Sequence, residues 1–555
     1  MTDLTQRQKL NQRWGALKTE RTSWMDHWRS ISEVLLPRSG RYFIDDVNKG
    51  QQRHNKIYDN TGTRALRVLA AGMMAGMTSP ARPWFRLTTS DAELDESAAV
   101  KAWLADVQRI MQMIFAKSNT YRALHSMYEE LGAFGTASSI IEPDFNNVIH
   151  HHVLTTGEYA IAMNYKGEVN TLFREFKMTV GQMVAEFGKQ ACSTNVQSLY
   201  ERGAVDQWVS VVHCIEPRME RDPRKRDGMN MPWKSVYFEP GNDSTKVLRE
   251  SGFKRFRGLC PRWAVSGGDI YGNSPAMEAL GDIKQLQHEQ LRKAQGIDYK
   301  TKPPLQVPTS VKNRDLDTLP GGISFVDSAQ PNGGVRTAFE TNIDLSHLLL
   351  DIQDVRERIK SSFYADLFLM LANSDNRNMT ATEVAERHEE KLLMLGPVLE
   401  RLHNEILNPL IETTFEAMVE AQIVPPPPPE MQGMELNVEF VSMLAQAQRA
   451  IATNSVDRFI GNLGAVAQFK PEVLDKLDAD RWADSYADML GIDPELIVPN
   501  EQVALIRQQR AQAQAAAEQA AMMQQGAATM KQLSETATTG DNALASVMDA
   551  FTGYT

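Results

Sequence analysis

Cysteine is scarce in this sequence, and the few cysteines present are not spaced for disulfide bonds or metal binding. The 555 residues contain 3 cysteines, Cys192, Cys214 and Cys260, and no CxxC pair occurs. Disulfide-stabilised secreted domains carry more cysteines, and zinc sites usually use closely paired ligands. We therefore expect neither a disulfide scaffold nor a zinc site, and we expect folding in an intracellular environment.

Long hydrophobic runs are also missing. The most apolar window, Val68 to Ala81, is bounded by Arg67 and Arg82 and is too short to cross a bilayer. The N-terminal stretch MTDLTQRQKLNQRW is polar, unlike the apolar centre of a signal peptide. These features predict a soluble protein without a membrane partner.

Motifs for ATP or metal chemistry are absent as well. No GxxxxGK[ST] loop occurs, and close helix packing explains the glycines of AGMMAG (71–76) better than phosphate binding does. The adjacent histidines 150–152 would alternate between the faces of a strand, so three could not reach one ion. His388 lacks the second histidine of HExxH, and Arg377 occupies a ligand position in the calcium-loop-like NSDNRN. We predict no catalytic residue, metal or cofactor, although a site assembled from distant residues leaves no sequence pattern.

The charge balance is acidic, with a formal net charge of −11. Tight binding of nucleic acid over a whole surface needs many Lys and Arg residues on phosphates, so this class of protein is disfavoured. The acidic charge does not exclude DNA that passes the protein without being bound tightly. The basic cluster PRMERDPRKRDG (217–228) also contains three acidic residues, which favours a solvated turn over a nucleic-acid or partner contact.

Hydrophobic periodicity predicts an α+β first half. Apolar residues from Leu10 to Leu35 recur at helical spacing and indicate one amphipathic helix, which Pro37 would end. Residues 138–265 instead alternate in short segments between Gly, Asn and Pro turns, which is typical of strands. Further helices are expected at 60–77, 96–116 and 121–134, with a short strand at WFRL (84–87).

The second half is mainly helical, with one interruption. Ser274 and Pro275 are suitable as the cap and first residue of a helix that runs to about 302. A segment with five prolines and two Gly-Gly pairs follows, at 303–334, and helical spacing resumes over 345–371. One helix therefore leads out, a small β-like tip follows, and a second helix leads back.

A polar loop then precedes a long helix expected over 380–424. Thr380 and Glu383 form a T-x-x-E capping box at its start. Pro397 and Pro409 lie inside it, where proline removes a hydrogen bond, so we expect a kink at one or both.

The end of the chain changes in composition. PPPPP (425–429) is a stiff spacer and a candidate boundary, and a compact helical segment should begin near Val438. From Asn500 the sequence is rich in Ala and Gln, which leaves open an exposed helix, a coiled assembly of copies and a frayed tail.

Several of these stretches resemble one protein family. IYGNSPAMEALGDIKQLQ (270–287), the proline-rich tip and LMLANSDNRNMTATEVAERHEEKLLMLGPVLERLHNEILNPLI (369–411) resemble the portal proteins, or head-to-tail connectors, of short-tailed podovirus-type bacteriophages. The resemblance extends to PWFRL and to the order helix, tip, helix, loop, long helix, and covers roughly residues 5–500.

The resemblance implies an α+β, mainly α-helical portal fold that assembles into a ring, typically of twelve copies, around an axial channel. It implies a wing at 1–270, stem helices at 271–302 and 337–366, a clip at 303–336, a tunnel loop at 367–379, a long kinked wing helix at 380–424, a crown at 425–499 and a C-terminal barrel helix or flexible tail at 500–555.

The resemblance also implies partners and a location. Double-stranded DNA would be driven through the ring by the ATPase of the terminase large subunit, and would later leave through the tail. The ring would occupy one vertex of the capsid in the virion, with the tail adaptor, tail tube, major capsid and scaffolding proteins as partners, after synthesis in the host bacterial cytoplasm. The clip would meet the terminase and then the tail adaptor through Leu319, Pro320, Gly321, Gly322, Ile323 and Phe325.

The tunnel loop carries the sharpest hypothesis. One Arg377 from each copy would form a positive ring at the narrowest point of the channel, where few phosphate contacts could steer DNA without holding it. The alternative is that Arg377 only pairs with Asp375 or with an acidic residue of a neighbouring copy. The competing function is a scaffold or tail adaptor through which no DNA passes. The loop residues are Asn373, Ser374, Asp375, Asn376, Arg377 and Asn378.

Overall fold

The structure is a computed structural model of the 555-residue chain, in which two compact units meet between Ser455 and Val456. Each unit is considered by itself. The described residues are 5–42, 50, 53, 55–89, 91, 97–225, 227–241, 246–302, 304–306, 336–337, 346–373, 395–431, 436–440, 459–467, 469–470, 472, 477–490, 498 and 500–534.

The N-terminal segment forms two helices, α1 (Gln6–Glu20) and α2 (Thr22–Val34), where the sequence predicted one. The break falls at Arg21, whose guanidinium is buried and donates to the carbonyl of Tyr159. The apolar period continues across Arg21, so it did not signal the break. Thr5 and Gln8 cap α1 with a reciprocal pair of hydrogen bonds.

The next elements of the first unit agree with the prediction. Helix α3 and strand β1 follow each other, and two helices, α5 and α6, lead into the sheet region. Gly135 ends α6 in the left-handed conformation, with a φ of 74°, which glycine adopts without a steric penalty. The bounds are α3 (Thr61–Met77), β1 (Phe85–Thr89), α5 (Ala98–Lys117) and α6 (Thr120–Phe134).

The predicted β-rich region forms two antiparallel sheets. One has five strands in the order β4-β5-β6-β7-β8, and the other has three in the order β3-β2-β9. Two eight-residue helices, α7 (Val180–Phe187) and α8 (Thr194–Glu201), interrupt the strands and were not predicted. The strands are β2 (Ser138–Asp144), β3 (Val148–Leu154), β4 (Tyr159–Met163), β5 (Val169–Thr179), β6 (Trp208–Pro217), β7 (Trp233–Phe238), β8 (Arg249–Phe253) and β9 (Gly258–Leu259).

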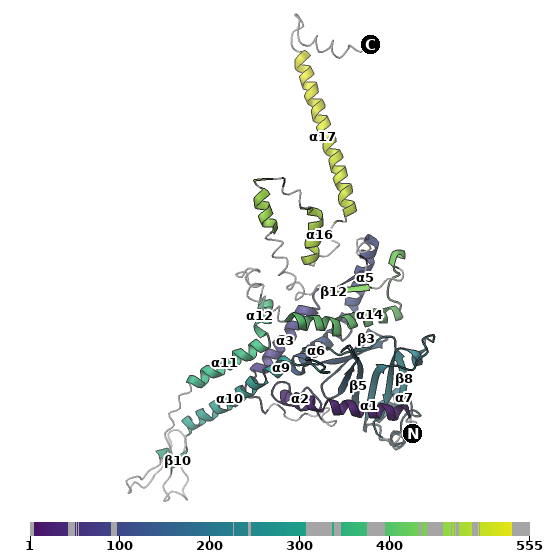
Figure 1. The fold of residues 1–555 in the computed structure, drawn as a ribbon, viewed down its shortest axis with the longest axis vertical. Helices are drawn as coiled ribbons and strands as arrows, with labels where there is room; N and C mark the ends of the chain where they lie inside the picture. The colour runs from purple at the N-terminus through teal and green to yellow at the C-terminus, as the bar shows by residue number, and fades with distance from the viewer. Residues whose placement is uncertain are drawn as a thin grey trace. The chain divides into compact units, whose positions relative to one another are not determined.

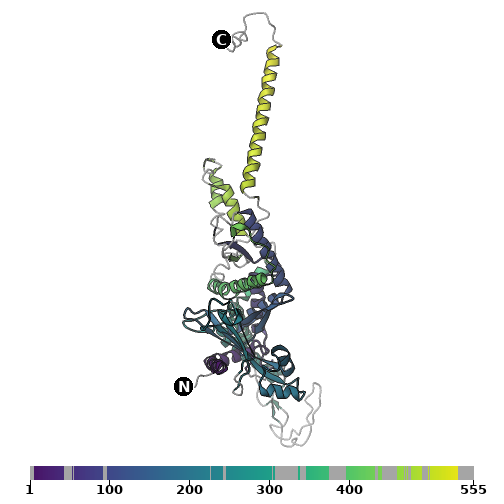
Figure 2. The ribbon, with the colours of Figure 1, turned by 90° about the vertical axis from the view of Figure 1, so that its right-hand side faces the viewer.

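Helices cover both faces of the five-stranded sheet (Figures 1 and 2). Trp14 of α1 is buried on one face and stacks on Phe173 of β5, with ring centroids 5.9 Å apart. Val180 and Met183 of α7 pack with Val211 of β6 on the other face. Neighbouring strand residues point to opposite faces, so β5, β6 and β7 each contribute to apolar clusters on both faces.

The predicted helix, tip and helix arrangement is present as far as the structure describes it. Ser274 Oγ accepts a hydrogen bond from the backbone N–H of Met277 at 3.0 Å, and Pro275 begins α9 (Pro275–Glu278), as predicted. Helices α10 (Leu280–Thr301) and α11 (Ser346–Ser362) lie side by side as a projecting hairpin, and α12 (Ala365–Asn373) follows (Figure 1). Two short strands, β10 (Leu305–Gln306) and β11 (Arg336–Thr337), pair antiparallel beyond α10.

The predicted long helix is helical from 395 but is not regular. Residues 395–402, including Pro397, are helical, and His403–Leu407 form a π-helical turn before α14 (Asn408–Glu420). Pro409 lacks the N–H that would bond to Glu405, and the Asn408 N–H instead reaches His403 five residues back. The irregularity therefore adjoins Pro409.

The segment after α14 differs from the prediction. A short 3-10 turn, Pro429–Met431, ends the proline run, and β12 (Leu436–Phe440) pairs antiparallel with β1. The expectation of a helix from Val438 was thus wrong for its first three residues, because a short apolar run fits strand and helix equally well.

The second unit contains helices. Residues 459–467 are helical, followed by α16 (Ala479–Leu490) and the 35-residue α17 (Asn500–Ser534). The Ala- and Gln-rich stretch is therefore a helix as far as Ser534. Arg507 of α17 holds Asp480 of α16 through two contacts of 2.5 and 2.7 Å.

Candidate functional site

The predicted docking and channel residues lie mostly outside the described residues. This holds for the clip residues Leu319, Pro320, Gly321, Gly322, Ile323 and Phe325, for Ser374, Asp375, Asn376, Arg377 and Asn378, and for the cap residues Thr380 and Glu383. Asn373 is the last residue of α12, and Pro397 lies in the helical residues 395–402. The candidate site is therefore built from the elements that lead into these segments.

Asp59, just before α3, joins three helices at the base of the hairpin. Its Oδ2 accepts from Arg356 of α11 at 2.6 Å and from Gln290 of α10 at 3.1 Å, and its Oδ1 accepts from the Thr61 N–H of α3 at 2.8 Å. Gln287 of α10 adds a hydrogen bond to the Asp59 carbonyl at 2.9 Å. The Asp59 carboxylate thus fixes the hairpin to the body of the first unit.

The electrostatics of Asp59 agree with this role. The residue is 8% exposed, so its charge loses hydration. Burial alone would raise its pKa, but hydrogen bonds from Thr61 and Arg356 outweigh burial, and the pKa is lowered. Asp59 is therefore charged at neutral pH and acts as a fixed anion for Arg356.

Two further contacts set the register of the hairpin. Arg358 of α11 lies 3.5 Å from Asp282 of α10. Seven residues further along both helices, Glu289 of α10 faces Asp351 of α11. Burial of Glu289, reinforced by the hydrogen bond and charge of Asp351, raises the pKa of Glu289. The apolar seam between the helices includes Ile283, Leu286, Ile352, Val355 and Ile359.

Helix α12, which leads into the predicted tunnel loop, is fixed by close packing on α3. Phe368 of α12 is buried, and its ring lies so near Gly72 that a Cβ there would overlap it. The expectation that the glycines of AGMMAG serve helix packing is confirmed at Gly72. Between α11 and α12, Tyr364 has a φ of 54°, so the turn uses a backbone conformation that is uncommon outside glycine.

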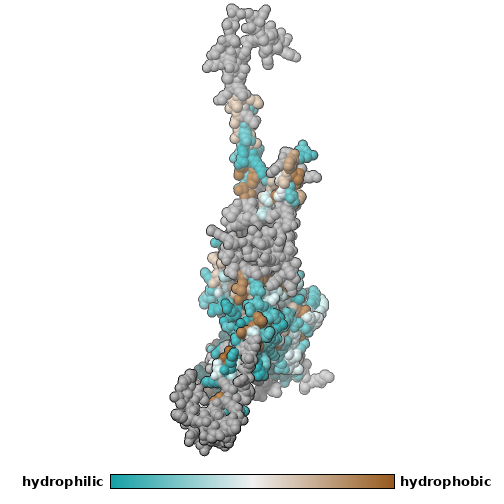
Figure 3. All heavy atoms as spheres, turned by 90° about the vertical axis from the view of Figure 1, so that its left-hand side faces the viewer, coloured by the Kyte–Doolittle hydropathy of each residue, from teal (hydrophilic) through white to brown (hydrophobic). Residues whose placement is uncertain are grey.

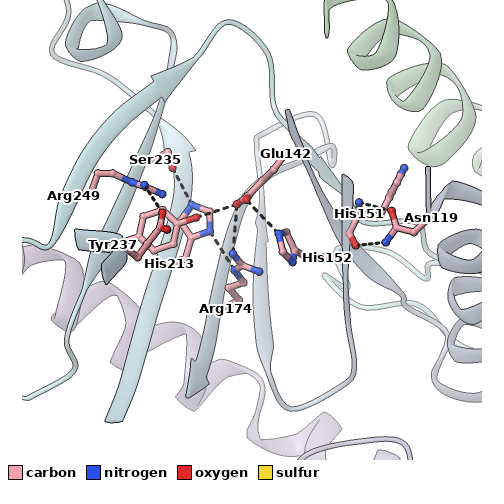
Figure 4. Close-up of polar contacts among 10 residues, drawn as sticks. Asn119, Glu142, His151, His152, Arg174, His213, Ser235, Tyr237 and Arg249 are labelled. Atoms are coloured by element: carbon pink, nitrogen blue, oxygen red, sulfur yellow. Dashed lines mark hydrogen bonds and ion pairs between the residues drawn. The ribbon is translucent and has the colours of Figure 1, made fainter. Parts of the chain in front are cut away.

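A polar network joins the two sheets (Figure 4). Glu142 of β2 accepts hydrogen bonds from Tyr237 of β7 at 2.9 Å and from Arg174 of β5 at 3.5 Å, and it contacts His152 Nε2 at 3.2 Å. Burial opposes its charge, but His152 and Arg174 outweigh burial and hold the pKa of Glu142 well below its usual value. Glu142 is therefore an anion that holds three strands.

His213 of β6 is the neutral, buried part of this network. Arg174 Nε donates to His213 Nδ1 at 3.2 Å, which fixes Nδ1 as an acceptor, and Nε2 contacts Ser235 Oγ at 2.9 Å. The ring stacks on Tyr237 with centroids 3.9 Å apart. Burial, with the charge of Arg174, holds the pKa of His213 well below its usual value. His213 therefore serves packing rather than proton transfer.

The histidines 150–152 do not converge on one ion. His151 is buried, and the Asn119 side chain accepts from its backbone N–H and donates to its carbonyl, both at 2.8 Å. Burial lowers the pKa of His151 to about 3. His150 and His152 instead share the other face, with ring centroids 4.9 Å apart. Among the described residues, no group of three or more His, Cys, Asp or Glu side chains is arranged to hold a metal ion.

Basic residues from the sheet region hold the irregular helix. Arg262 is buried and contacts Glu405 of the π-helical turn at 2.6 Å, while also donating to the Gly167 carbonyl at 2.8 Å. A row of acids four residues apart on α14 faces the segment after β8 through the pairs Lys254–Glu420, Lys254–Glu416, Arg255–Glu412 and Arg257–Glu420.

The surface around the hairpin is mixed. In the lower part of Figure 3, most of the visible described surface is hydrophilic, and hydrophobic residues form small groups. Residues 219–225 and 227 of the cluster at 217–228 are exposed, as expected of a solvated turn, whereas Arg218 is largely buried and contacts Glu250 at 2.7 Å. No described helix is long and apolar enough to cross a membrane. Exposed apolar side chains of α10 and α11 include Ile297, Tyr299, Leu349 and Leu350.

Sequence reasoning missed Asp59, Arg356, Glu142 and Arg262. Asp59 and Arg356 are 297 residues apart, so no local pattern connects them. The one available signal was Asp59 two residues before Thr61, a spacing at which an Asp side chain often bonds the start of a helix.

Comparison with known proteins identifies relatives over nearly the whole chain. The family described as bacteriophage head to tail connecting protein matches residues 7–498. A "probable portal protein" of Bordetella phage BPP-1 is 74% identical over 555 residues, all of both chains. A "portal protein" of Salmonella phage epsilon15 is 47% identical over 547 residues, 98% of both chains.

Solved structures resemble the chain more remotely. A chain from the virion of a native gene transfer agent particle is 10% identical, with a TM-score of 0.32 over 78% of this chain and 91% of that one. A chain from the neck of an empty gene transfer agent particle, computed with C6 symmetry, is 10% identical, with a TM-score of 0.34 over 79% and 91%.

Proposed function

The chain belongs to the family of bacteriophage head-to-tail connecting proteins, and on this basis we propose that it forms the portal ring at one vertex of a phage capsid. Double-stranded DNA enters the head through this ring during packaging and leaves through it at ejection. The observation that carries the proposal is the match over residues 7–498, together with full-length relatives at 74% and 47% identity that are named portal proteins.

The hairpin supports an assignment of parts. In the proposal, α10 and α11 are the stem helices of segments 271–302 and 337–366, and the clip at 303–336 follows at their far end. The body of the first unit, which holds α1 to α8 and the two sheets, is the wing. Asp59 fixes stem to wing at 2.6 Å from Arg356, so force applied to the clip reaches the wing through a defined contact.

The packing of α12 supports the channel assignment. This helix is packed on α3 through Phe368 and Gly72, and Asn373 is its last residue. Residues 367–373 of the predicted tunnel loop are helical and belong to α12, so the loop would be its remainder at 374–379, with Arg377, and would extend from a firmly held helix into the channel. A polar loop in a water-filled channel keeps its polar groups hydrated, whereas a packed interior would penalise them.

The remaining segments complete the proposed ring. The wing helix at 380–424 includes the π-helical turn, residues 425–499 contribute the crown, and residues 500–555 contribute a barrel helix or tail. Twelve copies, the terminase large subunit, the tail adaptor, and the capsid and scaffolding proteins are the partners. The role is structural, because the terminase supplies ATP hydrolysis.

Imaging of the purified full-length protein tests the proposal. Negative-stain micrographs and sedimentation velocity should show a closed ring with an open axial channel. Complementation of a phage that lacks its portal gene should then restore particles with DNase-protected DNA. A closed or filamentous particle, or a ring without effect on DNA content, would favour a scaffold or tail adaptor without DNA passage.

A further inference from the structure

The two helices of the hairpin carry opposite charges on the faces that point away from each other. On α10, the residues turned away from the apolar seam are exposed and include Lys284, His288 and Arg292. On α11, the corresponding exposed residues are Asp354 and Glu357. The first group is the basic face, and the second group is the acidic face.

The cations of the basic face have no acidic partner in the part of the chain that the structure describes. Arg292 contacts His288 at 3.4 Å and Gln295 at 3.2 Å, and neither residue is acidic. Lys284 lies near His27 of α2. Burial, with the positive charge of Lys284, lowers the pKa of His27. An anion facing Lys284 would relieve this repulsion.

The acids of the acidic face are held only by exposed pairs within α11. Glu357 contacts Lys360 at 2.7 Å, and Asp354 contacts Arg358 at 3.7 Å, with the two acidic side chains 58% and 66% exposed. Exposed pairs of this kind contribute little stability. Both carboxylates therefore remain available to a stronger partner.

The register of the hairpin places the two faces at the same height. The Asp282–Arg358 and Glu289–Asp351 contacts fix an antiparallel alignment, which puts Glu357 opposite Ile283 and Asp354 opposite Leu286. Each residue of an α-helix rises about 1.5 Å along the axis. Measured along the hairpin axis, Glu357 therefore lies about 1.5 Å from Lys284, and Asp354 lies about 3 Å from His288.

An exposed leucine adds an apolar contact to the acidic face. Leu350 of α11 is 65% exposed and lies within about 3 Å in height of Arg292 by the same register. The aliphatic stem of an arginine readily covers such a side chain while its charged end reaches a carboxylate. The acidic face therefore offers both charges and an apolar contact to a basic helix.

We propose that the basic face of α10 in one copy docks on the acidic face of α11 in the next copy, with Lys284 meeting Glu357 and Asp354, and with Arg292 covering Leu350. The inference rests on the proposed ring function and assigns one of its interfaces. Copies related by rotation about an axis along the hairpin keep the same height, so the equal levels of the two faces suit a contact that closes.

Charge reversal with mixing tests the interface. Lys284→Glu with Arg292→Glu gives a copy with two acidic faces, and Asp354→Lys with Glu357→Lys gives a copy with two basic faces. Because like charges then oppose each other, the ring fraction of each variant alone should fall about tenfold or more in sedimentation velocity. An equimolar mixture should recover rings, with the two variants in a 1:1 ratio by native mass spectrometry.

Matched variants separate charge from folding. Lys284→Arg with Arg292→Lys keeps the charges and should form rings like the unchanged protein. Asp354→Asn with Glu357→Gln should lower the ring fraction less than charge reversal, and thermal melting of every variant should show an intact fold.

The outcomes separate this inference from the proposed function. Rings from both reversed variants alone, or folded variants whose mixture fails to assemble, would overturn the docking of these faces while leaving the ring intact. If the unchanged protein forms no ring, the proposed function itself fails.

Discussion

Arg356 of α11 and Asp59, just before α3, form an ion pair with Nη2 and Oδ2 2.6 Å apart. The Asp59 side chain is 6% exposed and the Arg356 side chain is 41% exposed, so the contact has one buried and one partly hydrated end. Because Asp59 also binds Gln290 and the start of α3, it joins the hairpin to the body of the first unit.

The first prediction concerns this contact. Asp59→Ala should lower the free energy of unfolding by about 2–4 kcal/mol, because it leaves several buried donors without an acceptor. Arg356→Ala should cost less, about 1–2 kcal/mol, because the arginine is partly exposed. Urea unfolding of both single variants and the double variant gives the coupling energy between the two side chains, and additive effects would contradict a direct interaction.

The same contact has a defined pH dependence. The pKa of Asp59 is lower in the folded chain than its ordinary value, so its stabilisation is complete above that ordinary value of 3.8 and is lost as the pH falls further. Measured between pH 3 and pH 5, the free energy of unfolding of the unchanged protein should decrease as the pH falls, and it should decrease less in Asp59→Asn.

Glu130 of α6 should have the opposite pH dependence. It is 6% exposed, and its Oε1 accepts from Thr155 Oγ1 at 2.6 Å, which holds the turn between β3 and β4. Burial raises the pKa of Glu130 to about 7. The folded state therefore binds a proton more tightly than the unfolded state, and stability should fall as the pH rises from about 4.5 to about 7.

A substitution isolates that effect. Relative to Glu130→Gln, the unchanged protein should lose up to about 3 kcal/mol of unfolding free energy between pH 5 and pH 8. Glu130→Gln keeps an acceptor for Thr155 without a charge, so its stability should change less over this range. If the unfolding free energies of the two proteins changed equally with pH, the stated titration of Glu130 would be wrong.

The contact between Gly72 and Phe368 predicts a third result. Gly72→Ala should destabilise the protein by about 1–3 kcal/mol, because the added methyl overlaps a buried ring in a packed contact. Phe368→Leu should recover part of this loss by making room. Gly15→Ala in α1 is the matched control. It has no atom near the added Cβ, and should be neutral or stabilising by about 0.5–1 kcal/mol. Equal effects at both glycines would rule out the packing argument.

Local sequence patterns predicted where helices and strands form better than they predicted which residues contact each other. Ser274 and Pro275 were recognised because a cap and a first-turn proline act within a few residues of themselves. The break at Arg21 was missed because the apolar period continues across it, and the contact of Arg21 with the Tyr159 carbonyl, far along the chain, leaves no local pattern. Helices α7 and α8 were missed because eight residues hold about two turns, too few for a clear period.

The candidate site depended even more on distant contacts. The Glu142 network needs β2, β3, β5 and β7 at once, and alternation within a strand reveals only which residues share a face. Family resemblance supplied the predicted functional segments, and the structure supplied contacts of the neighbouring elements, such as Phe368 on Gly72 before the predicted tunnel loop.

The clip prediction separates docking from assembly. Deletion of residues 319–332 should leave ring formation unchanged, because the hairpin contacts of Asp59 and Asp282 lie outside the deleted segment. The same deletion should abolish tail attachment, measured as the fraction of tailed particles in electron micrographs. Loss of the ring would instead show that the segment is part of the core.

Arg377 provides the last prediction. If one copy per subunit faces DNA in the channel, Arg377→Ala should lower the yield of DNA-filled particles by about two- to tenfold, because a single ring of charges makes few phosphate contacts at a time. Arg377→Lys keeps the charge and should restore most of the yield. The measurement is DNase-protected DNA per particle in complemented phage, with ring assembly checked by negative stain. If arginine only pairs with Asp375 or with a neighbouring copy's acid, the alanine variant should package normally or assemble poorly. Normal rings with unchanged packaging and retention of DNA would therefore exclude a role for Arg377 in guiding DNA.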